Sequence, residues 1–519
     1  MTPQQQQPLP PIIGGERVLI TIALAFAAFM QALDSSIANV AIPTLSGDLG
    51  VSATQGTWVI TSFAVASAIS VPLTGWLARR FGEVKLFCTA VLLFTLASWG
   101  CGLANDISML IFFRILQGFV AGPMTPLSQT LLLSIYPPEK KGSALALWSI
   151  TTLTAPIAGP LLGGWITDNI SWPWIFFINL PIGVLCAAVC WNRLRSRESA
   201  TVKIPIDAIG LALLVIGVGC LQVMLDQGRE LDWFESTEIV TLTVIAAIAL
   251  AALIIWELTA AHPIIDLHLF QDRNFTTGTL VASIAFLAYM GIVVILPLWL
   301  QTQMGYTATW AGLVMAPTGI LAIMLMPLIG RNLHRINVRY ICTFSFVVFA
   351  ICCFWRANFN SEVNFAYVLG PQWLQGIATA CLFVPITGLV LSNMKPWQMA
   401  SASGLSNFCR ILSTSFGTSL TTTLWDRRAS LHHATLTEHI NVYDPQFTGM
   451  VGSAAAANGS VPTTTFAAIE QMITQQAYML STVDLFWLYG CIFLAAIPIL
   501  WIARPSKPAA GAPVIVASD

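Results

Sequence analysis

Three charged residues interrupt long apolar runs of the sequence: Asp34, Arg114 and Arg410. A charge in apolar surroundings is costly unless a partner or enclosed water compensates for it. An acid beside a guanidinium is also an arrangement whose protonation responds to its surroundings. We therefore take Asp34 and Arg114 as candidate proton-coupling residues and Arg410 as a candidate residue of a substrate cavity.

The positions of Asp34 and Arg114 within their runs favour a contact between them. Asp34 lies nine residues before Pro43, and Arg114 lies seven residues after Ile107, where a later run begins on the same side. With a rise of 1.5 Å per residue, both lie roughly 10–14 Å from that side. Burial disfavours a charged carboxylate and a guanidinium favours it, so entry of water or substrate would shift the balance. The alternative is a static ion pair that fixes helix packing.

Other polar residues within apolar runs are candidates for lining a substrate cavity. They are Asn39, Gln117 and Gln375. Arg410 adds a cation to the second half of the chain, without an acid in the interior of the apolar runs there. This predicts a cavity that accepts neutral or anionic amphiphiles more readily than dications. The alternatives are helix packing for the glutamines and hydrogen bonding to backbone carbonyls for Arg410.

The composition places most of the chain in lipid. Of 519 residues, 56% are hydrophobic and 9% are charged, and the mean hydropathy is +0.76. A soluble domain carries about 25% charged residues, so we expect an integral membrane protein. The net charge of −1 argues against nucleic-acid binding. The eleven cysteines form no Cys-x-x-Cys pair, so we expect free thiols and no metal site.

Fourteen apolar runs approach the roughly 20-residue length that crosses a bilayer as a helix. The expected spans are Val18–Ile42, Gly56–Ala78, Leu86–Leu103, Ile107–Ile135, Ser143–Thr167, Trp172–Trp191, Asp207–Leu225, Glu238–Trp256, Thr276–Leu300, Thr309–Gly330, Tyr340–Trp355, Phe365–Leu391, Ser401–Leu424 and Val483–Ala503. We divide the chain into a tail (1–16), a six-helix bundle (17–191), a linker with two inserted helices (192–274), a second six-helix bundle (275–503) and a tail (504–519).

The positive charges predict the orientation of these spans. With the N-terminus in the cytoplasm, only four of the 23 Lys and Arg residues fall in outer segments: Arg229, Arg356, Arg427 and Arg428. This bias fits the positive-inside rule and places both termini in the cytoplasm. The polar stretch 425–482 would then be an outer loop, either a flexible one or a docking surface.

Short matches recur between the two bundles in the same order. They are Thr57-Trp58 with Thr309-Trp310, Pro72-Leu73-x-Gly75 with Pro327-Leu328-x-Gly330, Leu116-Gln117-Gly118 with Leu374-Gln375-Gly376, and Ser143-Ala144 with Ser401-Ala402. Their offset grows slowly along the chain, as in a diverged duplication. Parallel repeats of this kind are typical of transporters whose substrate site lies between the halves.

The motifs at these positions resemble those of the major facilitator superfamily, in particular its fourteen-helix drug:proton antiporters. Residues 75–83 (GWLARRFGE) are similar to the loop between helices 2 and 3, residues 114–122 to the helix 4 motif, and residues 159–164 (GPLLGG) to the antiporter motif of helix 5. Residues 33–43 are similar to the helix 1 signature. The resemblance implies this superfamily's all-α fold, with two six-helix pseudo-repeats plus two inserted helices.

The resemblance also implies proton-driven export by alternating access, without a cofactor. It assigns a gating or structural role to the motif residues Gly75, Arg79, Gly82, Gly118, Gly159, Pro160, Gly163 and Gly164. Close helix packing is the alternative for the glycines. The family usually has Asp at the position of Arg79, so its acid-mediated latch is not expected here in the usual form.

Longer stretches, among them QGTWVITSF (Gln55–Phe63) and SWPWIFFINLPIG (Ser171–Gly183), resemble EmrB/FarB-like multidrug exporters. These are inner-membrane pumps of Gram-negative bacteria. The resemblance implies substrates such as hydrophobic weak acids, uncouplers, antibiotics and fatty acids. It also implies a periplasmic EmrA-like adaptor and a TolC-like outer-membrane channel as partners.

Two other function classes remain open: a proton symporter or passive facilitator, and a membrane-embedded lipid-modifying enzyme. The sequence contains no Gly-x-x-x-x-Gly-Lys-[Ser/Thr] motif, which argues against an ATP-driven pump. It also lacks Gly-x-Ser-x-Gly and His-Glu-x-x-His, which argues against two common kinds of hydrolase.

Overall fold

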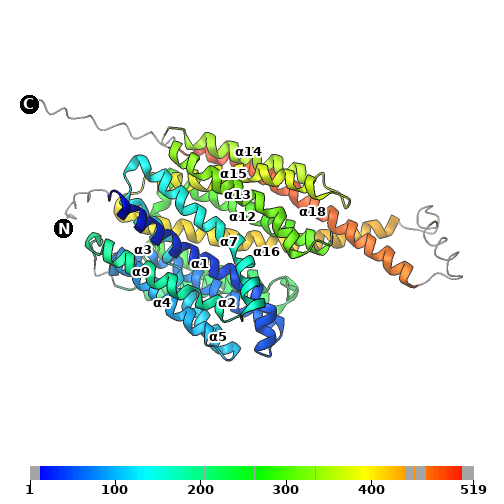
Figure 1. Ribbon diagram of the computed structural model, residues 1–519, viewed down its shortest axis with the longest axis horizontal. Coiled ribbons are helices and arrows are strands. Elements are labelled where there is room, and N and C mark those ends of the chain that lie inside the picture. Colours follow the sequence, from blue (N-terminus) through cyan, green and yellow to red (C-terminus); the bar gives the residue numbers. More distant parts are fainter. Residues whose placement is uncertain are drawn as a thin grey trace, which may run out of the picture.

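The computed structural model describes residues 12–202, 205–261, 263–333, 335–439, 449 and 463–504, and within these ranges the regular structure is entirely helical. The helices form one elongated bundle, in which α1 (Gly15–Asp48) begins at the same end at which α18 (Thr463–Ile502) finishes (Figure 1). We call this end of the bundle the inner end and the opposite end the outer end. Because the first helix begins and the last helix ends at the same end of the bundle, the chain crosses the bundle an even number of times.

The first bundle follows the expected spans, with breaks at prolines. Besides α1 it contains α2 (Ala53–Ser70), α3 (Thr74–Phe81), α4 (Glu83–Gly102), α5 (Ile107–Ala121), α6 (Met124–Ile135), α7 (Lys141–Asn169), α8 (Trp174–Phe177) and α9 (Asn179–Leu194). The expected helix over 107–135 is divided into α5 and α6 at Pro123, because proline has no N–H for the helical ladder. A short 3₁₀ turn at Val71–Leu73 likewise separates α2 from α3.

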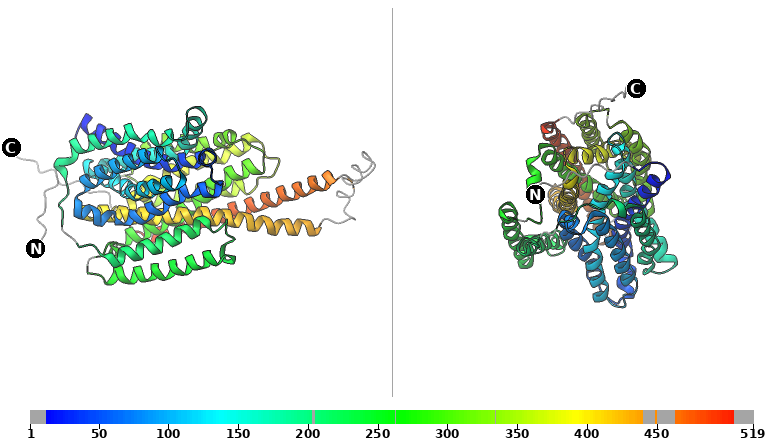
Figure 2. Two further views of the ribbon diagram at one scale, coloured as in Figure 1. Left: turned by 90° about the horizontal axis from the view of Figure 1, so that it is seen from below. Right: turned by 90° about the vertical axis from the view of Figure 1, so that its left-hand side faces the viewer.

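The second part of the chain holds the inserted pair and the second bundle. Its helices are α10 (Ala208–Gln227), α11 (Thr237–Thr259), α12 (Arg273–Thr302), α13 (Ala308–Asn332), α14 (Val338–Arg356), α15 (Phe365–Val390), α16 (Met399–His439) and α18. Helices α10 and α11 lie together along one side of the bundle (Figure 2). Among the described residues, twelve helices are long and apolar enough to cross a membrane, and α7 and α16 cover the other two expected spans.

The two bundles repeat the same helix contacts, as the sequence matches predicted. A β-carbon built on Gly118 of α5 would lie 2.4 Å from the carbonyl oxygen of Phe63 in α2. One built on Gly376 of α15 would lie 2.9 Å from the carbonyl oxygen of Thr318 in α13. Gly376 and Thr318 are the repeat counterparts of Gly118 and Phe63. In each bundle the glycine therefore lets the corresponding two helices approach closely.

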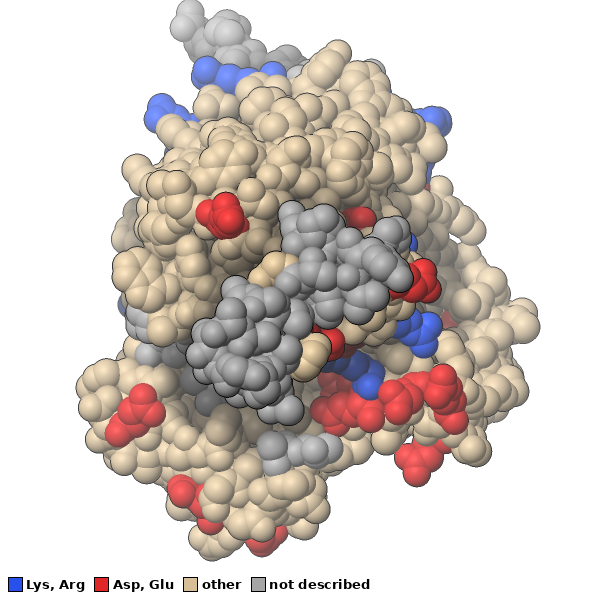
Figure 3. Space-filling model, turned by 90° about the vertical axis from the view of Figure 1, so that its right-hand side faces the viewer, with Lys and Arg blue, Asp and Glu red and all other residues tan. Residues whose placement is uncertain are grey.

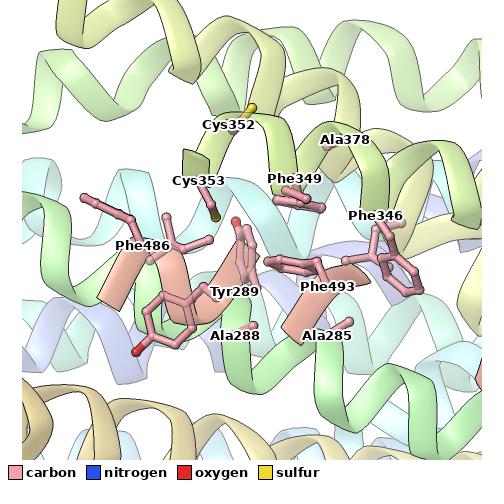
Figure 4. Close-up of a cluster of buried hydrophobic side chains, with 14 of the residues drawn as sticks. Ala285, Ala288, Tyr289, Phe346, Phe349, Cys352, Cys353, Ala378, Phe486 and Phe493 are labelled. Carbon is pink, nitrogen blue, oxygen red and sulfur yellow. The ribbon is translucent and has the colours of Figure 1, made fainter. Parts of the chain in front are cut away.

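The core of the second bundle is aromatic and sulfur-rich. Phe349 of α14 stacks on Phe493 of α18 with ring centroids 4.6 Å apart, and Tyr289 of α12 meets Phe349 edge-on at 6.0 Å (Figure 4). Cys352 and Cys353 are buried beside these rings as free thiols (Figure 4). Such packing fixes α12, α14 and α18 as one unit.

The expected outer loop over 425–482 is wrong in its extent, because most of that stretch is helical. Helix α16 continues to His439 and α18 begins at Thr463, and the two project beyond the outer end as a pair of helices (Figures 1 and 2). We call residues 425–439 and 463–482 the outer hairpin. Trp425 Nε1 donates to Thr482 Oγ1 at 2.9 Å and Arg428 pairs with Asp484 at 2.7 Å, which ties the two helices together. The Gly- and Ala-rich residues 450–460 lie outside the described residues.

Candidate functional site

The ion pair expected between Asp34 and Arg114 is present in the first bundle. Arg114 Nη1 lies 2.5 Å from Asp34 Oδ2, and both side chains are 0% exposed. Asp34 comes from α1 and Arg114 from α5. A charge pair this deeply buried is stable only if hydrogen bonds satisfy its remaining polar atoms.

Two amides complete the surroundings of the Asp34 carboxylate. Gln117 Nε2 and Asn179 Nδ2 both donate to Asp34 Oδ1, at 2.9 Å and 3.0 Å, and Gln117 Oε1 accepts from Arg114 at 2.8 Å. Asn179 also donates to Ser98 Oγ at 2.9 Å. Asp34 therefore accepts from three donors on α1's neighbours α5 and α9, so that both of its carboxylate oxygens are hydrogen-bonded.

The guanidinium of Arg114 is enclosed by aromatic rings and backbone. Its Nε donates to the carbonyl oxygen of Val59 at 2.9 Å, and its Cζ lies 4.2 Å from the ring centre of Phe63 and 5.7 Å from that of Phe176. Two polar atoms of the Asp34 site lack a hydrogen-bond partner among the described residues: Arg114 Nη2 and Asn179 Oδ1. The site therefore retains one spare donor and one spare acceptor.

The glycines of the expected antiporter motif bring α7 against α1 beside this site. A β-carbon on Gly159 would lie 2.5 Å from Ser36 Cβ, and one on Gly163 would lie 2.8 Å from Ile37 Cγ1. Ser36 and Ile37 closely follow Asp34 in α1. Larger residues at Gly159 or Gly163 of α7 would therefore displace the segment that carries the acid. Gly164 is partly exposed, and the side chain of Pro160 lies outside the described residues.

The loop motif of residues 75–83 is closed by a carboxylate from another segment. Gly82 has a φ of +92°, a conformation that favours glycine. Glu198, which follows α9, accepts from the N–H groups of Val84 and Lys85 at 2.9 Å and 2.8 Å. It thus satisfies the N-terminus of α4. The carbonyl oxygen of Arg79 accepts from Val202 N at 2.9 Å, so the linker fastens this loop without an acid at position 79.

A cavity lies between the two bundles, and Arg410 lines it. Its volume is about 30 Å³, room for one or two water molecules. Gln129 and Trp148 come from the first bundle, whereas Phe286, Asn407 and Arg410 come from the second. Arg410 Nη2 donates to Asn407 Oδ1 at 2.6 Å, and its Cζ lies 5.3 Å from the ring centre of Phe286. Its partner is thus a side-chain amide, not the backbone carbonyl proposed as an alternative.

The other residues expected to line a cavity do not line this one. Gln117 is held within the Asp34 site. Asn39 is exposed and donates to the carbonyl oxygen of Ser35, one turn earlier in α1. Gln375 is buried inside the second bundle, and neither of its amide atoms has a hydrogen-bond partner among the described residues. The hydropathy pattern located these polar residues at membrane depth but did not indicate which way each side chain points.

Two residues of these sites, Asn179 and Gln129, were not expected from the sequence. Both are polar residues within apolar runs, and this position is the signal that could identify them. Arg356 was assigned to an outer segment, but it is fully buried at the end of α14, with its Cζ 5.7 Å from the ring centre of Phe486. None of its three guanidinium nitrogens has a partner among the described residues.

The comparisons with known proteins agree with this architecture. The model of the Major Facilitator Superfamily matches residues 24–418. The chain belongs to this superfamily. Its relatives within the superfamily include the "Multidrug export protein EmrB" of Escherichia coli K12, 53% identical over 98% of this chain and 99% of that protein. They also include the "Fatty acid resistance protein FarB" of Neisseria gonorrhoeae, 49% identical over 96% of this chain and 98% of that protein.

Solved structures of the superfamily show the same fold at low sequence identity. The proton:xylose symporter XylE superposes with a TM-score of 0.60 at 14% identity, covering 95% of this chain and 97% of that one. The human organic anion transporter MFSD10 superposes with a TM-score of 0.60 at 11% identity, covering 94% and 100%. The expected resemblance and fold are therefore confirmed, and the chain is a multi-pass membrane transporter of the major facilitator superfamily and not an enzyme.

Proposed function

We propose that this transporter is a proton-coupled antiporter that exports hydrophobic and amphiphilic compounds by alternating access. The observation that carries the proposal is the sealed Asp34 site, where one acid is the common acceptor of Arg114, Gln117 and Asn179. The names of the relatives, multidrug export and fatty acid resistance, support export as the direction and amphiphiles as the cargo.

The Asp34 site has the parts that a proton-exchange site needs. With all three donors in place, both carboxylate oxygens of Asp34 accept hydrogen bonds. A protonated carboxyl needs an acceptor, and the unpartnered Oδ1 of Asn179 belongs to the amide that already contacts Asp34. Rotation of that amide would present its oxygen to the protonated acid. The pair is 0% exposed here, so we propose that water reaches it only when the bundles move.

The two bundles are in close contact at the inner end, as we propose for the conformation that releases cargo on the outer side. The two bundles meet there through paired glycine contacts, Gly75 with Ser401 and Gly330 with Gly142. No such close glycine contact joins the bundles at their outer ends among the described residues. Breaking the glycine contacts at the inner end would open the cavity to the inner side.

The residues that line the cavity at Arg410 favour neutral and anionic amphiphiles as substrates, which would enter when movement of the bundles enlarges this cavity. One guanidinium faces walls that include Phe286, Phe383 and Leu391. A cation beside apolar walls suits a carboxylate with a hydrophobic tail and disfavours a dication. Preferential transport of dications over such anions would contradict this assignment.

We further propose that the transporter works in the inner membrane of a Gram-negative bacterium, with both termini cytoplasmic, a periplasmic EmrA-like adaptor and a TolC-like outer-membrane channel. The outer hairpin projects from the end that would face the periplasm. Acidic side chains gather on the face around it (Figure 3), and the turn between α10 and α11 contributes acids such as Glu230, Asp232 and Glu235. A projecting, polar pair of helices beside an acidic surface is a suitable contact for an extended partner.

Everted membrane vesicles with an imposed proton gradient test the coupling. We expect an added substrate to dissipate the gradient with the unaltered protein and not with Asp34→Asn, while substrate binding persists. Asp48→Asn removes an exposed acid from the end of the same helix and serves as the matched control. Transport that does not depend on the proton gradient would indicate a facilitator. If substrate still dissipated the gradient in the Asp34→Asn variant, Asp34 would have no role in proton coupling.

A further inference from the structure

Gln129 joins the two bundles at the cavity. Its Oε1 accepts from Ser403 Oγ at 2.7 Å and from Asn407 Nδ2 at 3.1 Å. Gln129 lies in α6, whereas Ser403 and Asn407 lie in α16, and all three side chains are buried. These hydrogen bonds cross from one bundle to the other, so parting of the bundles at the inner end would break them.

The same contact fixes the orientation of the Asn407 amide. Asn407 Nδ2 also donates to the carbonyl oxygen of Ser403 at 2.8 Å, so the amide nitrogen points toward Gln129 and its own helix. The amide oxygen therefore points the other way, where it accepts from Arg410 Nη2 at 2.6 Å. A rotated amide would place its N–H₂ group against the guanidinium and lose all of these hydrogen bonds.

Arg410 has no acidic partner among the described residues. Its guanidinium donates a hydrogen bond to the amide oxygen of Asn407 and lies over the ring of Phe286. Because a guanidinium binds a carboxylate more strongly than a neutral amide, the amide is a partner that a carboxylate would replace. Replacement requires the Asn407 side chain to turn away, which its hydrogen bonds to Gln129 and to the carbonyl oxygen of Ser403 oppose. Of these two hydrogen bonds, the one to Gln129 depends on contact between the bundles.

We infer that Gln129 is a positioning residue that makes the affinity of Arg410 for organic carboxylates depend on conformation. With the inner end closed, Gln129 holds Asn407 against Arg410 and weakens carboxylate binding. When the bundles part at the inner end, Asn407 is released and Arg410 binds a carboxylate from that side. An anionic cargo is then bound tightly on one side and weakly on the other, which is the difference in affinity that export requires.

This inference rests on the proposed export function, but binding measurements test it without a proton gradient. A disulfide between Thr74→Cys and Gly404→Cys would lock the inner end, because a β-carbon on Gly404 lies 3.2 Å from Thr74 Cβ, near the usual span of a disulfide. The probes are decanoate and the neutral decanamide, which share the same apolar tail. Their dissociation constants are measured for the locked and the unlocked protein in nanodiscs.

We expect Gln129→Met to tighten decanoate binding by the locked protein about tenfold, the effect of freeing one charged hydrogen bond. Decanamide binding should change little. The unlocked protein can part its bundles without the substitution, so its affinity for decanoate should change less than that of the locked protein. Ser403→Ala removes the other hydrogen bond to Gln129 and should give a smaller change in the same direction. Arg410→Gln should abolish the preference for decanoate over decanamide.

Unchanged decanoate affinity in locked Gln129→Met, or equal changes for decanamide, would overturn the inference and leave Gln129 with a packing role. Retention of the decanoate preference in Arg410→Gln would overturn the assignment of Arg410. Neither result bears on Asp34, whose role is decided by the vesicle experiment. A conformation-dependent affinity without proton coupling would therefore refute the antiport proposal and keep this one.

Discussion

Gly75 of the first bundle lies so close to Ser401 of the second that a β-carbon on the glycine would come within 2.7 Å of the serine Cα. The repeat-related contact is equally tight, since a β-carbon on Gly330 would lie 2.5 Å from the carbonyl oxygen of Gly142. Real β-carbons do not approach backbone atoms this closely. The two contacts therefore close the inner end only because no side chain is present at either glycine.

Gly75→Ala should shift the transporter toward conformations with an open inner end. The added methyl group must displace the backbone of α16 or part the bundles, and parting is the movement that transport already uses. We expect faster labelling of a cysteine introduced at Ser403 by a membrane-impermeant maleimide in everted vesicles. Gly312→Ala is the control, because a β-carbon there meets nothing within 4 Å. Equal labelling rates for the two variants would show that the contact at Gly75 does not hold the inner end closed.

Asn179→Ala should lower the thermal stability of the protein, because it removes one of the three donors to the buried carboxylate of Asp34. The loss of a hydrogen bond to a buried charged group costs about 1.5–3 kcal/mol. The measurement is thermal unfolding of the purified protein in detergent. Asn39→Ala, which alters an exposed amide on α1, should leave the thermal midpoint in place, and equal midpoints for the two variants would contradict the assigned contact.

Arg356→Met should not destabilise the protein, although it replaces a fully buried residue. The guanidinium has no hydrogen-bond partner among the described residues and contacts only the ring of Phe486, so its removal eliminates a desolvation cost while a similar volume remains. Arg114→Met should instead cost about 3–5 kcal/mol, because it leaves Asp34 buried without its cation. Thermal unfolding of the purified protein in detergent compares the two variants. A large loss of stability for Arg356→Met would reveal a bound anion or another partner at that site.

Glu198→Ala should lower the stability of the first bundle by about 1 kcal/mol, the usual value of a helix-capping side chain. The carboxylate accepts from two free N–H groups at the start of α4, and alanine would leave both without that partner. Glu16→Ala is the matched control, because its pair with Arg193 is exposed and spans 3.6 Å. The thermal midpoint of Glu198→Ala should be lower than that of Glu16→Ala. Equal midpoints would mean that the linker does not stabilise the loop.

The sequence was sufficient for the fold because its repeats and apolar runs are long and regular. The contact between Asp34 and Arg114 was also predictable, since depth in a membrane follows directly from the position in a helix. The outer hairpin was missed because hydropathy reports contact with lipid, whereas these helical turns are polar and rely on pairs such as Trp425 with Thr482. The role of Gln129 was missed because its partners lie more than 270 residues away in sequence.

The length of α16 has a mechanical consequence. This single 41-residue helix carries Asn407 and Arg410 near one end and the outer hairpin at the other. The distance from Arg410 to His439 along the helix is roughly 43 Å. A tilt of 10° at the cavity would therefore move the far end of the helix by roughly 7.5 Å, so a small rearrangement beside Arg410 is amplified into a large displacement of the outer hairpin.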